Sequence, residues 1–153
     1  MRAVLQRVSN ASVSVDGIVL GRIGVGLVLF VAIKHDDTDE DIEYLTEKII
    51  NMRVFGNLEG RFDRSLIDVE GDLLVISQFT LYADTRKGRR PSFTNSATAA
   101  EAEPRFNKLL QRLSEHNITV ETGRFGGMME VSLVNDGPVT IILDSGDRHK
   151  ARK

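Results

Sequence analysis

Two short polar segments carry the residue types from which a reactive site could be built. The first is SQFT, Ser77 to Thr80, which follows an apolar run and offers hydroxyls, an amide and main-chain N–H groups. Hydroxyls and amides bind and orient substrates, and main-chain N–H groups can stabilise an oxyanion. Because functional groups often lie where a strand gives way to a loop, we predict a ligand-binding or catalytic site here. A strand end that satisfies its own hydrogen bonds is the simpler alternative.

The second segment is NDGPVT, Asn135 to Thr140, which lies between two apolar runs. Gly137 tolerates a positive φ, Pro138 fixes its own φ, and Asn or Asp can bond to the local backbone, so the segment suits a hairpin turn. Alternatively, a cis Gly-Pro bond could hold carbonyl oxygens outward to grip a ligand. The residues alone leave both interpretations open.

Basic residues follow each polar segment. The cations after the first are Arg86, Lys87, Arg89 and Arg90, and those after the second are Arg148, Lys150, Arg152 and Lys153. Such runs are either solvated loops and tails or phosphate-binding surfaces. Two polar strand ends, each trailed by cations, favour a nucleic-acid terminus that is held by its phosphates while one end enters a pocket.

Other familiar sites are disfavoured by their sequence context. The glycine-rich stretch 21–26 precedes a strand, whereas a phosphate-binding loop should open a helix. The acidic run beginning at His35 is typical of a helix N-terminus, so we expect no metal site there. His116 and His149 have no nearby serine motif, which disfavours a serine hydrolase triad. The chain contains no cysteine, which excludes thiolate nucleophiles and thiolate metal sites.

The composition is that of an ordinary soluble globular protein. The chain has 153 residues, 41% of them hydrophobic and 27% charged, with a net charge of −2, which argues against a generally basic nucleic-acid protein. The opening segment alternates and carries charge, unlike a signal peptide, and the longest apolar run, LVLFVAI, is too short to span a bilayer. We therefore expect a single cytoplasmic domain without membrane contact.

The hydrophobic pattern predicts which elements position the two polar segments. Strands are expected at 1–8, 11–15, 18–23, 27–33 and 72–81, with short ones near 118, at 129–134 and at 139–143. A first helix should follow a cap at Thr38, and a second should cover about Ser96 to Glu115, opened or kinked by Pro104. The predicted class is α+β, a strand-rich curved sheet or partly closed β-barrel covered by two helices. It forms one domain, 1–145, with a basic tail, 146–153.

Four stretches resemble the D-aminoacyl-tRNA deacylases: LQRVSNASV, SQFTLYAD, KGRRPSF and TGRFGGMMEVSLVNDGPVT. The similarity runs from Met1 to about Leu143, and SQFTL followed by NDGPVT at this separation is the specific combination. Two departures stand out. Members of the family often carry a Lys-Met-Asn type stretch where this chain has Arg61, Phe62 and Asp63, and the tail from Gly146 looks like an extension.

The resemblance implies a tRNA-binding ester hydrolase that frees tRNA from D-amino acids and acts as a homodimer without a metal or organic cofactor. It further implies that the Gly137–Pro138 bond is cis and that this pair enters the partner subunit's pocket, where its carbonyls hold the substrate's amino group. A D side chain or hydrogen would then fit, whereas an L side chain would collide with the main chain. Glycyl-tRNA should therefore also be cleaved.

The resemblance also suggests roles for individual residues. Main-chain N–H groups at Phe79 and Thr80 would polarise the ester carbonyl, Ser77 and Gln78 would shape the pocket, and the terminal ribose hydroxyl would assist attack by water. Thr80 as a covalent nucleophile is the rival mechanism, and it lacks an evident activating base.

Supporting roles fall on residues further along the chain. Arg7 is expected to brace the Gly-Pro loop of its own subunit. The pocket would be lined by Phe125, Gly126 and Met129, although a core role suits these three nearly as well. The tRNA would be bound by Arg86, Lys87, Arg89 and Arg90. A non-catalytic RNA- or DNA-binding module is the competing function, and a purely structural self-associating protein would leave SQFT unexplained.

Overall fold

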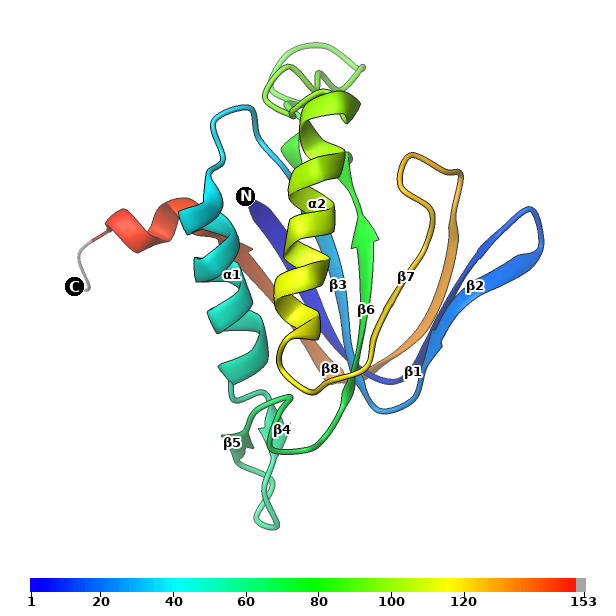
Figure 1. Cartoon of the computed structure of the whole chain (residues 1–153), viewed down its shortest axis with the longest axis vertical. Helices are drawn as coiled ribbons and strands as arrows, with labels where there is room; N and C mark the ends of the chain where they lie inside the picture. The colour runs from blue at the N-terminus through cyan, green and yellow to red at the C-terminus, as the bar shows by residue number, and fades with distance from the viewer. Residues whose placement is uncertain (151–153) are drawn as a thin grey trace.

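The structure, a computed structural model, describes residues 1–150, which form a curved and nearly closed mixed sheet with two helices side by side against it (Figure 1). The sheet order is β2-β1-β3-β6-β7, and β8 pairs with β1. The strands of this sheet are β1 (Arg2–Val15), β2 (Ile18–Ile23), β3 (Gly26–Ala32), β6 (Asp72–Ser77), β7 (Val120–Thr122) and β8 (Glu130–Asp144). The predicted α+β class and barrel-like sheet are confirmed. Arg152 and Lys153 of the predicted tail lie outside the described residues.

Strand β1 organises the sheet because three strands pair with it. Its first half pairs with β3, its second half with β2, and β8 runs along nearly its whole length. The inward side chains are the apolar ones, with Ala3, Leu5 and Val13 buried completely. The two strands predicted for 1–8 and 11–15 are therefore one strand.

Strands β3 and β6 are parallel and buried on both faces, which explains their nearly continuous apolar sequences. The last pair in their ladder is Val31 with Ser77. Beyond it β3 ends, and the chain turns into the short 3-10 helix η1 (Phe79–Tyr82). The prediction that this strand continues to Leu81 is wrong, because no partner strand extends past Ser77.

Each helix begins with a capping box and packs an apolar stripe against the sheet. In α1 (Asp39–Asn51) Thr38 pairs with Asp41, and in α2 (Ala99–Ser114) Thr98 pairs with Glu101. The buried apolar side chains are Ile42, Leu45, Ile49 and Ile50 on α1, and Ala102, Phe106, Leu109 and Leu113 on α2. Pro104 lies inside the first turns of α2.

Ion pairs join the helices to each other and to the end of the chain. Lys108 Nζ lies 2.6 Å from Asp39 Oδ2, and Arg148 pairs with Asp41 from the 3-10 helix η2 (Ser145–His149). Arg148 is therefore not a solvated tail cation. No helix among residues 1–150 combines the length and the apolarity needed to cross a membrane.

The segment Asn135–Val139 is not the turn of a hairpin, which corrects the simpler prediction. Strand β8 pairs with β1 on both sides of it, Val8 with Asn135 and Gln6 with Thr140, so residues 136–139 bulge out of the ladder opposite Arg7. The side chain of Asn135 closes the base of this bulge. Its Nδ2 donates to the carbonyl oxygens of Arg7, at 3.0 Å, and Val139, at 2.9 Å. We call residues 136–139 the Gly-Pro loop.

A small hairpin stands apart from the main sheet, at the lower end in Figure 1. It consists of β4 (Phe55–Gly56) and β5 (Phe62–Arg64), and it was not predicted. Its base is anchored by Val54 and Phe55, which are buried, whereas Leu58 near its tip is fully exposed. The hairpin contains the stretch 61–63 that departs from the family pattern.

Candidate active site

A pocket of about 530 Å³ opens at the carboxyl end of β6, between α2 and the segment 123–129. This is the end of a parallel strand at which α/β sheets usually bind ligands. It brings together six of the predicted site residues from two distant segments: Ser77, Gln78, Phe79, Phe125, Gly126 and Met129. Their roles in catalysis stay predictions, but their proximity is a feature of the fold.

Helix α2 supplies a wall of the pocket that the sequence did not reveal. Ala102 and Phe106 line it, and the ring of Phe106 packs 5.6 Å from that of Phe125. Small alanines at 97, 99 and 102 leave the space open near the start of the helix. The clustering of alanine near the start of α2 is the one signal in the sequence that points to this wall.

Among residues 1–150, those that line the pocket include no acidic, basic or other titratable side chain. The lining hydroxyls belong to Ser77 and Ser96, and the nearby Thr80 hydroxyl accepts a hydrogen bond from the Gln78 side-chain amide. Thr80 itself is exposed and does not line the pocket. General acid–base chemistry by a protein side chain therefore has no candidate in the pocket wall.

Two main-chain donors at the start of η1 have no acceptor among residues 1–150. Phe79 and Thr80 are the first residues of η1, where N–H groups have no intrahelical partner. Within residues 1–150 neither N–H donates to another protein group, whereas Gln78 N donates to Val31 O at 2.8 Å. The pair is therefore available to a carbonyl oxygen or an oxyanion.

The mouth of the pocket is apolar and exposed. Phe79 is 57% exposed and Met128 is 89% exposed, and the Phe79 ring meets Phe93 edge-on at 5.0 Å. Large apolar side chains at the rim of a cavity usually mark an interaction surface. The structure thus presents a hydrophobic rim around a pocket whose only polar groups are uncharged.

The Gly-Pro loop lies away from the pocket of its own chain. The Gly137–Pro138 bond is cis, and neither residue lines the pocket. In the sheet, Arg7 pairs with Leu27, and Leu27 pairs with Leu73. The rise along β6 from Leu73 to Ser77 is roughly 13 Å at about 3.3 Å per residue. Within one chain, the loop and the pocket therefore lie at different positions along the strand direction of the same sheet.

Arg7, on β1, contacts the Gly-Pro loop. Its Nη1 donates to Val54 O at 2.6 Å, and its Nε lies 3.0 Å from Asp136 Oδ2, an ion pair without the alignment of a hydrogen bond. An ideal Cβ at Gly137, whose φ is +117°, would lie only 2.9 Å from Arg7 Nη2. The guanidinium and the glycine are thus in close contact, as the proposed supporting role of Arg7 requires.

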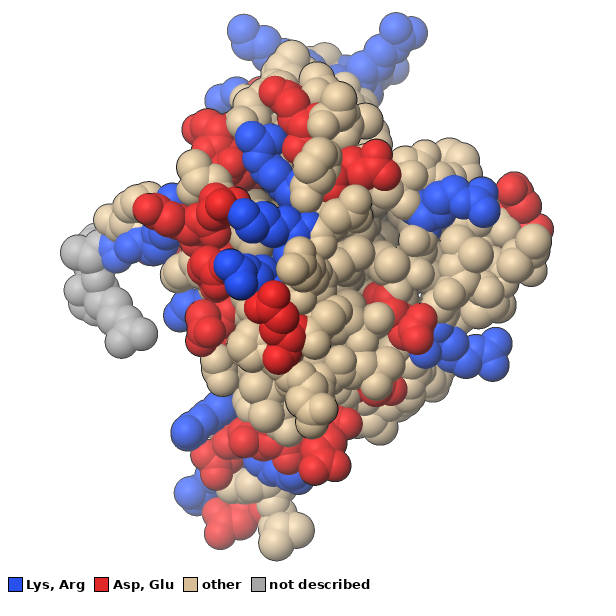
Figure 2. Space-filling model, viewed as in Figure 1, with Lys and Arg blue, Asp and Glu red and all other residues tan. Residues whose placement is uncertain are grey.

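The predicted tRNA-binding cations lie on the exposed segment between η1 and α2. Arg86 is held by Asp84, whose Oδ1 accepts from its Nε at 2.9 Å, and this hydrogen bond lowers the pKa of Asp84. The other three, Lys87, Arg89 and Arg90, form no ion pair with any of residues 1–150. In Figure 2 basic side chains project at the top of the molecule, where this segment lies in Figure 1.

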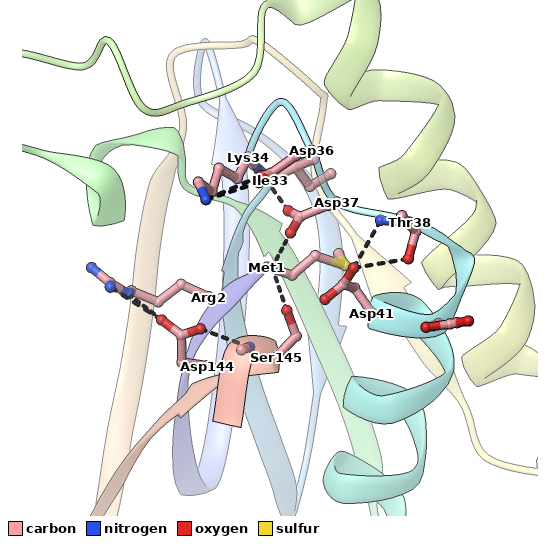
Figure 3. Close-up of polar contacts among 12 residues, drawn as sticks. Met1, Arg2, Ile33, Lys34, Asp36, Asp37, Thr38, Asp41, Asp144 and Ser145 are labelled. Carbon is pink, nitrogen blue, oxygen red and sulfur yellow. Dashed lines mark hydrogen bonds and ion pairs between the residues drawn. The ribbon is translucent and has the colours of Figure 1, made fainter. Parts of the chain in front are cut away.

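A second, polar cavity of about 760 Å³ lies around the first residues of β1. Figure 3 shows the amino group of Met1 between Asp37 and Ser145, with Ser145 Oγ at 2.6 Å. Burial would raise the pKa of Asp41, but hydrogen bonds to its carboxylate outweigh burial and lower it. Burial likewise raises the pKa of Tyr82. The cavity's charges pair with one another, so it forms a structural network.

The sequence matches known proteins along almost its whole length. Residues 4–144 match the family described as D-Tyr-tRNA(Tyr) deacylase. A protein of Herpetosiphon aurantiacus named D-aminoacyl-tRNA deacylase is 52% identical over 152 residues, which cover 99% of each chain. A protein of the same name from Chloroflexus aurantiacus is 54% identical over 153 residues, covering 100% of this chain and 96% of the relative.

Two solved structures resemble the fold closely. One, titled c-Myc DNA Unwinding Element Binding Protein, has a TM-score of 0.89 at 37% identity and covers 94% of this chain and 98% of its own. The other is described as a probable eukaryotic D-amino acid tRNA deacylase and has a TM-score of 0.82 at 17% identity, covering 93% and 97%. The second supports the fold alone.

Proposed function

This chain belongs to the D-Tyr-tRNA(Tyr) deacylase family, and from that premise we propose that it hydrolyses the ester of D-aminoacyl-tRNA. The products are free tRNA and the D-amino acid. The proposal is based on the pocket, whose described lining residues have no titratable side chain. Beside it are the N–H groups of Phe79 and Thr80, which have no acceptor among residues 1–150. An aminoacyl ester is already activated, so a site that orients it and stabilises its oxyanion can suffice.

The proposed reaction needs no covalent enzyme intermediate. The N–H groups of Phe79 and Thr80 hydrogen-bond the ester carbonyl oxygen and the tetrahedral oxyanion that forms from it. Water attacks the carbonyl carbon and gives a proton to the oxygen of the 2′-hydroxyl of the terminal ribose. The 2′-hydroxyl passes its own proton to the ribose 3′-oxygen, which leaves as a hydroxyl when the ester C–O bond breaks. Ser77 and Gln78 shape the wall against which the aminoacyl group rests.

Stereochemical selection requires a second copy of the chain in this proposal. The Gly-Pro loop of one subunit enters the pocket of its partner, where its carbonyls accept hydrogen bonds from the substrate's amino group. A two-fold dimer supplies one loop to each pocket. The separation of loop and pocket within one chain supports this arrangement, because the chain's own loop does not line its own pocket. An L side chain would meet the main chain of the loop, whereas a D side chain or the hydrogen of glycine would not.

Cleavage of matched substrates tests the function directly. We expect the protein to hydrolyse D-tyrosyl-tRNA at least about a hundredfold faster than L-tyrosyl-tRNA, and to cleave glycyl-tRNA as well, because exclusion acts only on an L side chain. Rates are measured from the loss of acid-precipitable labelled amino acid at equal tRNA concentrations. Equal cleavage of the D and L substrates would contradict stereochemical selection by the Gly-Pro loop. If neither substrate is cleaved, the proposed hydrolase activity is wrong.

A second candidate function, binding of DNA or RNA without catalysis, is favoured by one observation. The solved structure that is 37% identical carries a title that describes DNA binding. The exposed cations at 87–90 would serve such a role as well as they serve tRNA. This function predicts affinity without ester cleavage, so the same D-tyrosyl-tRNA assay distinguishes the two.

Salt dependence tests the cations of the segment between η1 and α2. Replacing Lys87, Arg89 and Arg90 together by Gln should weaken tRNA binding and make the slope of log K against log salt shallower by about two. Arg86 is left in place because Asp84 already pairs with it. Arg22→Gln, an exposed cation on β2, is the matched control and should change neither quantity. An unchanged slope in the triple variant would mean that these three cations do not contact the tRNA phosphates.

A further inference from the structure

Phe62 holds an exposed aromatic ring against the residue that braces the Gly-Pro loop. Its side chain is 58% exposed, and Arg7 Cζ lies 5.6 Å from the centroid of its ring. A guanidinium within about 6 Å of an aromatic centroid is attracted to the face of the ring. A large apolar side chain is therefore kept at the surface, in contact with a cation that is itself only 13% exposed.

The guanidinium of Arg7 is fixed on its other sides as well. Nη1 donates to Val54 O at 2.6 Å, and Nε lies 3.0 Å from Asp136 Oδ2. Nη2 faces Gly137 so closely that a Cβ there would be 2.9 Å away. The loop and the hairpin thus meet at one planar group, and the position of that group limits where the loop can lie.

The hairpin that carries Phe62 is a firm support. Phe62 pairs with Gly56, and the turn between them is closed by Asn57 N, which donates to Arg61 O at 2.9 Å. Arg53 Nη1 lies 3.4 Å from Asp63 Oδ1, which ties the hairpin to the segment before it. Buried residues anchor its base, so the ring is presented to Arg7 from an ordered element.

We propose that Phe62 is a positioning residue for stereochemical selection, which it serves by holding the Arg7 guanidinium against the Gly-Pro loop. The inference rests on the proposed function. With the ring in place, the loop keeps its carbonyls aimed at the amino group and its main chain in the path of an L side chain. Without the ring, Arg7 loses one of the contacts that fix it and the loop is less constrained, so the aminoacyl group of the D substrate is oriented less precisely and the L substrate is excluded less strictly.

Phe62→Ala tests the inference against Leu58→Ala, a matched change at a fully exposed residue of the same hairpin. We expect Phe62→Ala to lower kcat for D-tyrosyl-tRNA about three- to tenfold, in line with the loss of one cation–ring contact. KM should stay unchanged because the tRNA is held elsewhere. The ratio of D to L cleavage should fall, and Leu58→Ala should behave as wild type in every respect.

Two further replacements separate the ring face from apolar bulk. Phe62→Tyr keeps an aromatic face and should restore both kcat and discrimination, whereas Phe62→Leu keeps bulk alone and should behave like Phe62→Ala. The inference is overturned if Leu rescues as well as Tyr, or if Phe62→Ala matches Leu58→Ala. A thermal midpoint that falls while kcat and discrimination hold would also overturn it, because that pattern indicates a purely structural role.

Amide hydrogen exchange supplies a readout that needs no substrate. In Phe62→Ala, but not in Leu58→Ala or Phe62→Tyr, the peptide covering 135–140 should exchange faster than in wild type. If wild type fails to distinguish D from L substrates, the proposed function is wrong, yet the exchange comparison still decides whether Phe62 fixes the loop. If wild type discriminates and neither exchange nor kcat responds to Phe62→Ala, only the present inference fails.

Discussion

Gly137→Ala is expected to lower hydrolysis of D-aminoacyl-tRNA by about 10²-fold or more while the protein still folds. Gly137 has a φ of +117°, which L side chains rarely adopt, and a Cβ would lie 2.9 Å from both Arg7 Nη2 and Val139 Cγ2. Arg7 cannot simply retreat, since Val54 O and Asp136 hold it. The loop must therefore shift, and its carbonyls shift with it. The backbone strain, about 1–3 kcal/mol, is small enough for the domain to survive.

Gly17→Ala is the matched control for this substitution. Gly17 has a φ of +76° at the tip of the β1–β2 hairpin, and a Cβ there would have nothing within 4 Å. It should cost comparable stability and leave the rate unchanged. Near-normal D-specific cleavage by a folded Gly137→Ala protein would refute the assignment of the loop.

Mixed dimers extend the test to the cross-subunit site. Ala102→Phe should fill the pocket of its own chain but leave the Gly-Pro loop intact, so neither it nor Gly137→Ala is active alone. After random reassortment, about half of the dimers contain one of each, and each has one complete site, which restores about a quarter of wild-type activity. No recovery in a mixture that reassorts, or full activity in a monomer, would contradict the dimer.

A substrate whose terminal ribose lacks the 2′-hydroxyl is expected to be cleaved about 10²- to 10⁴-fold more slowly than the natural D-aminoacyl-tRNA. The reason is the composition of the pocket wall, which contains no side chain that can accept a proton. In the proposed mechanism, the ribose hydroxyl relays the proton of the attacking water. The comparison uses the acceleration over spontaneous hydrolysis of each ester, because the missing hydroxyl slows that reaction too. Equal acceleration of both esters would exclude this role of the substrate.

Thr80→Ala is the companion variant for this mechanism. It removes the hydroxyl that accepts from Gln78 but keeps the main-chain N–H, so activity should stay within about threefold of wild type. An aminoacyl ester trapped on Thr80 would reverse the assignment and make it the nucleophile.

The local patterns predicted much of the fold for identifiable physical reasons. Thr38 with Asp41 forms a local capping box, and both helical stripes are read from residues close in sequence. Both β3 and β6 are runs of buried apolar residues bounded by polar ones. Only part of the pocket could be predicted from the sequence. The family resemblance assigned Ser77–Phe79 and Phe125–Met129 to one site, whereas their spacing in the sequence could not.

The misassignments arose where tertiary pairing overrides a local signal. The segment NDGP has the composition of a turn, yet β1 pairs with β8 on both sides of it and turns it into a bulge. The strand expected to reach Leu81 stops at Ser77 because β3 ends beside it. Ala102 and Phe106 belong to the apolar stripe of α2, and nothing in a helical stripe indicates which part of it borders an opening. Likewise, the proposed role of Phe62 follows only from its contact with Arg7, which lies far away in the sequence.

The free donors of η1 have a genetic consequence. A side-chain catalyst can be deleted by many single-nucleotide changes, but an N–H of the main chain is present whatever residue is encoded, unless the codon becomes one for proline. In the proposed mechanism, most missense changes at Phe79 and Thr80 would therefore leave the oxyanion donors in place and alter only the fit around them. Inactivating missense mutations should instead concentrate at positions that set the backbone geometry. In such an enzyme these positions are chiefly glycines and prolines.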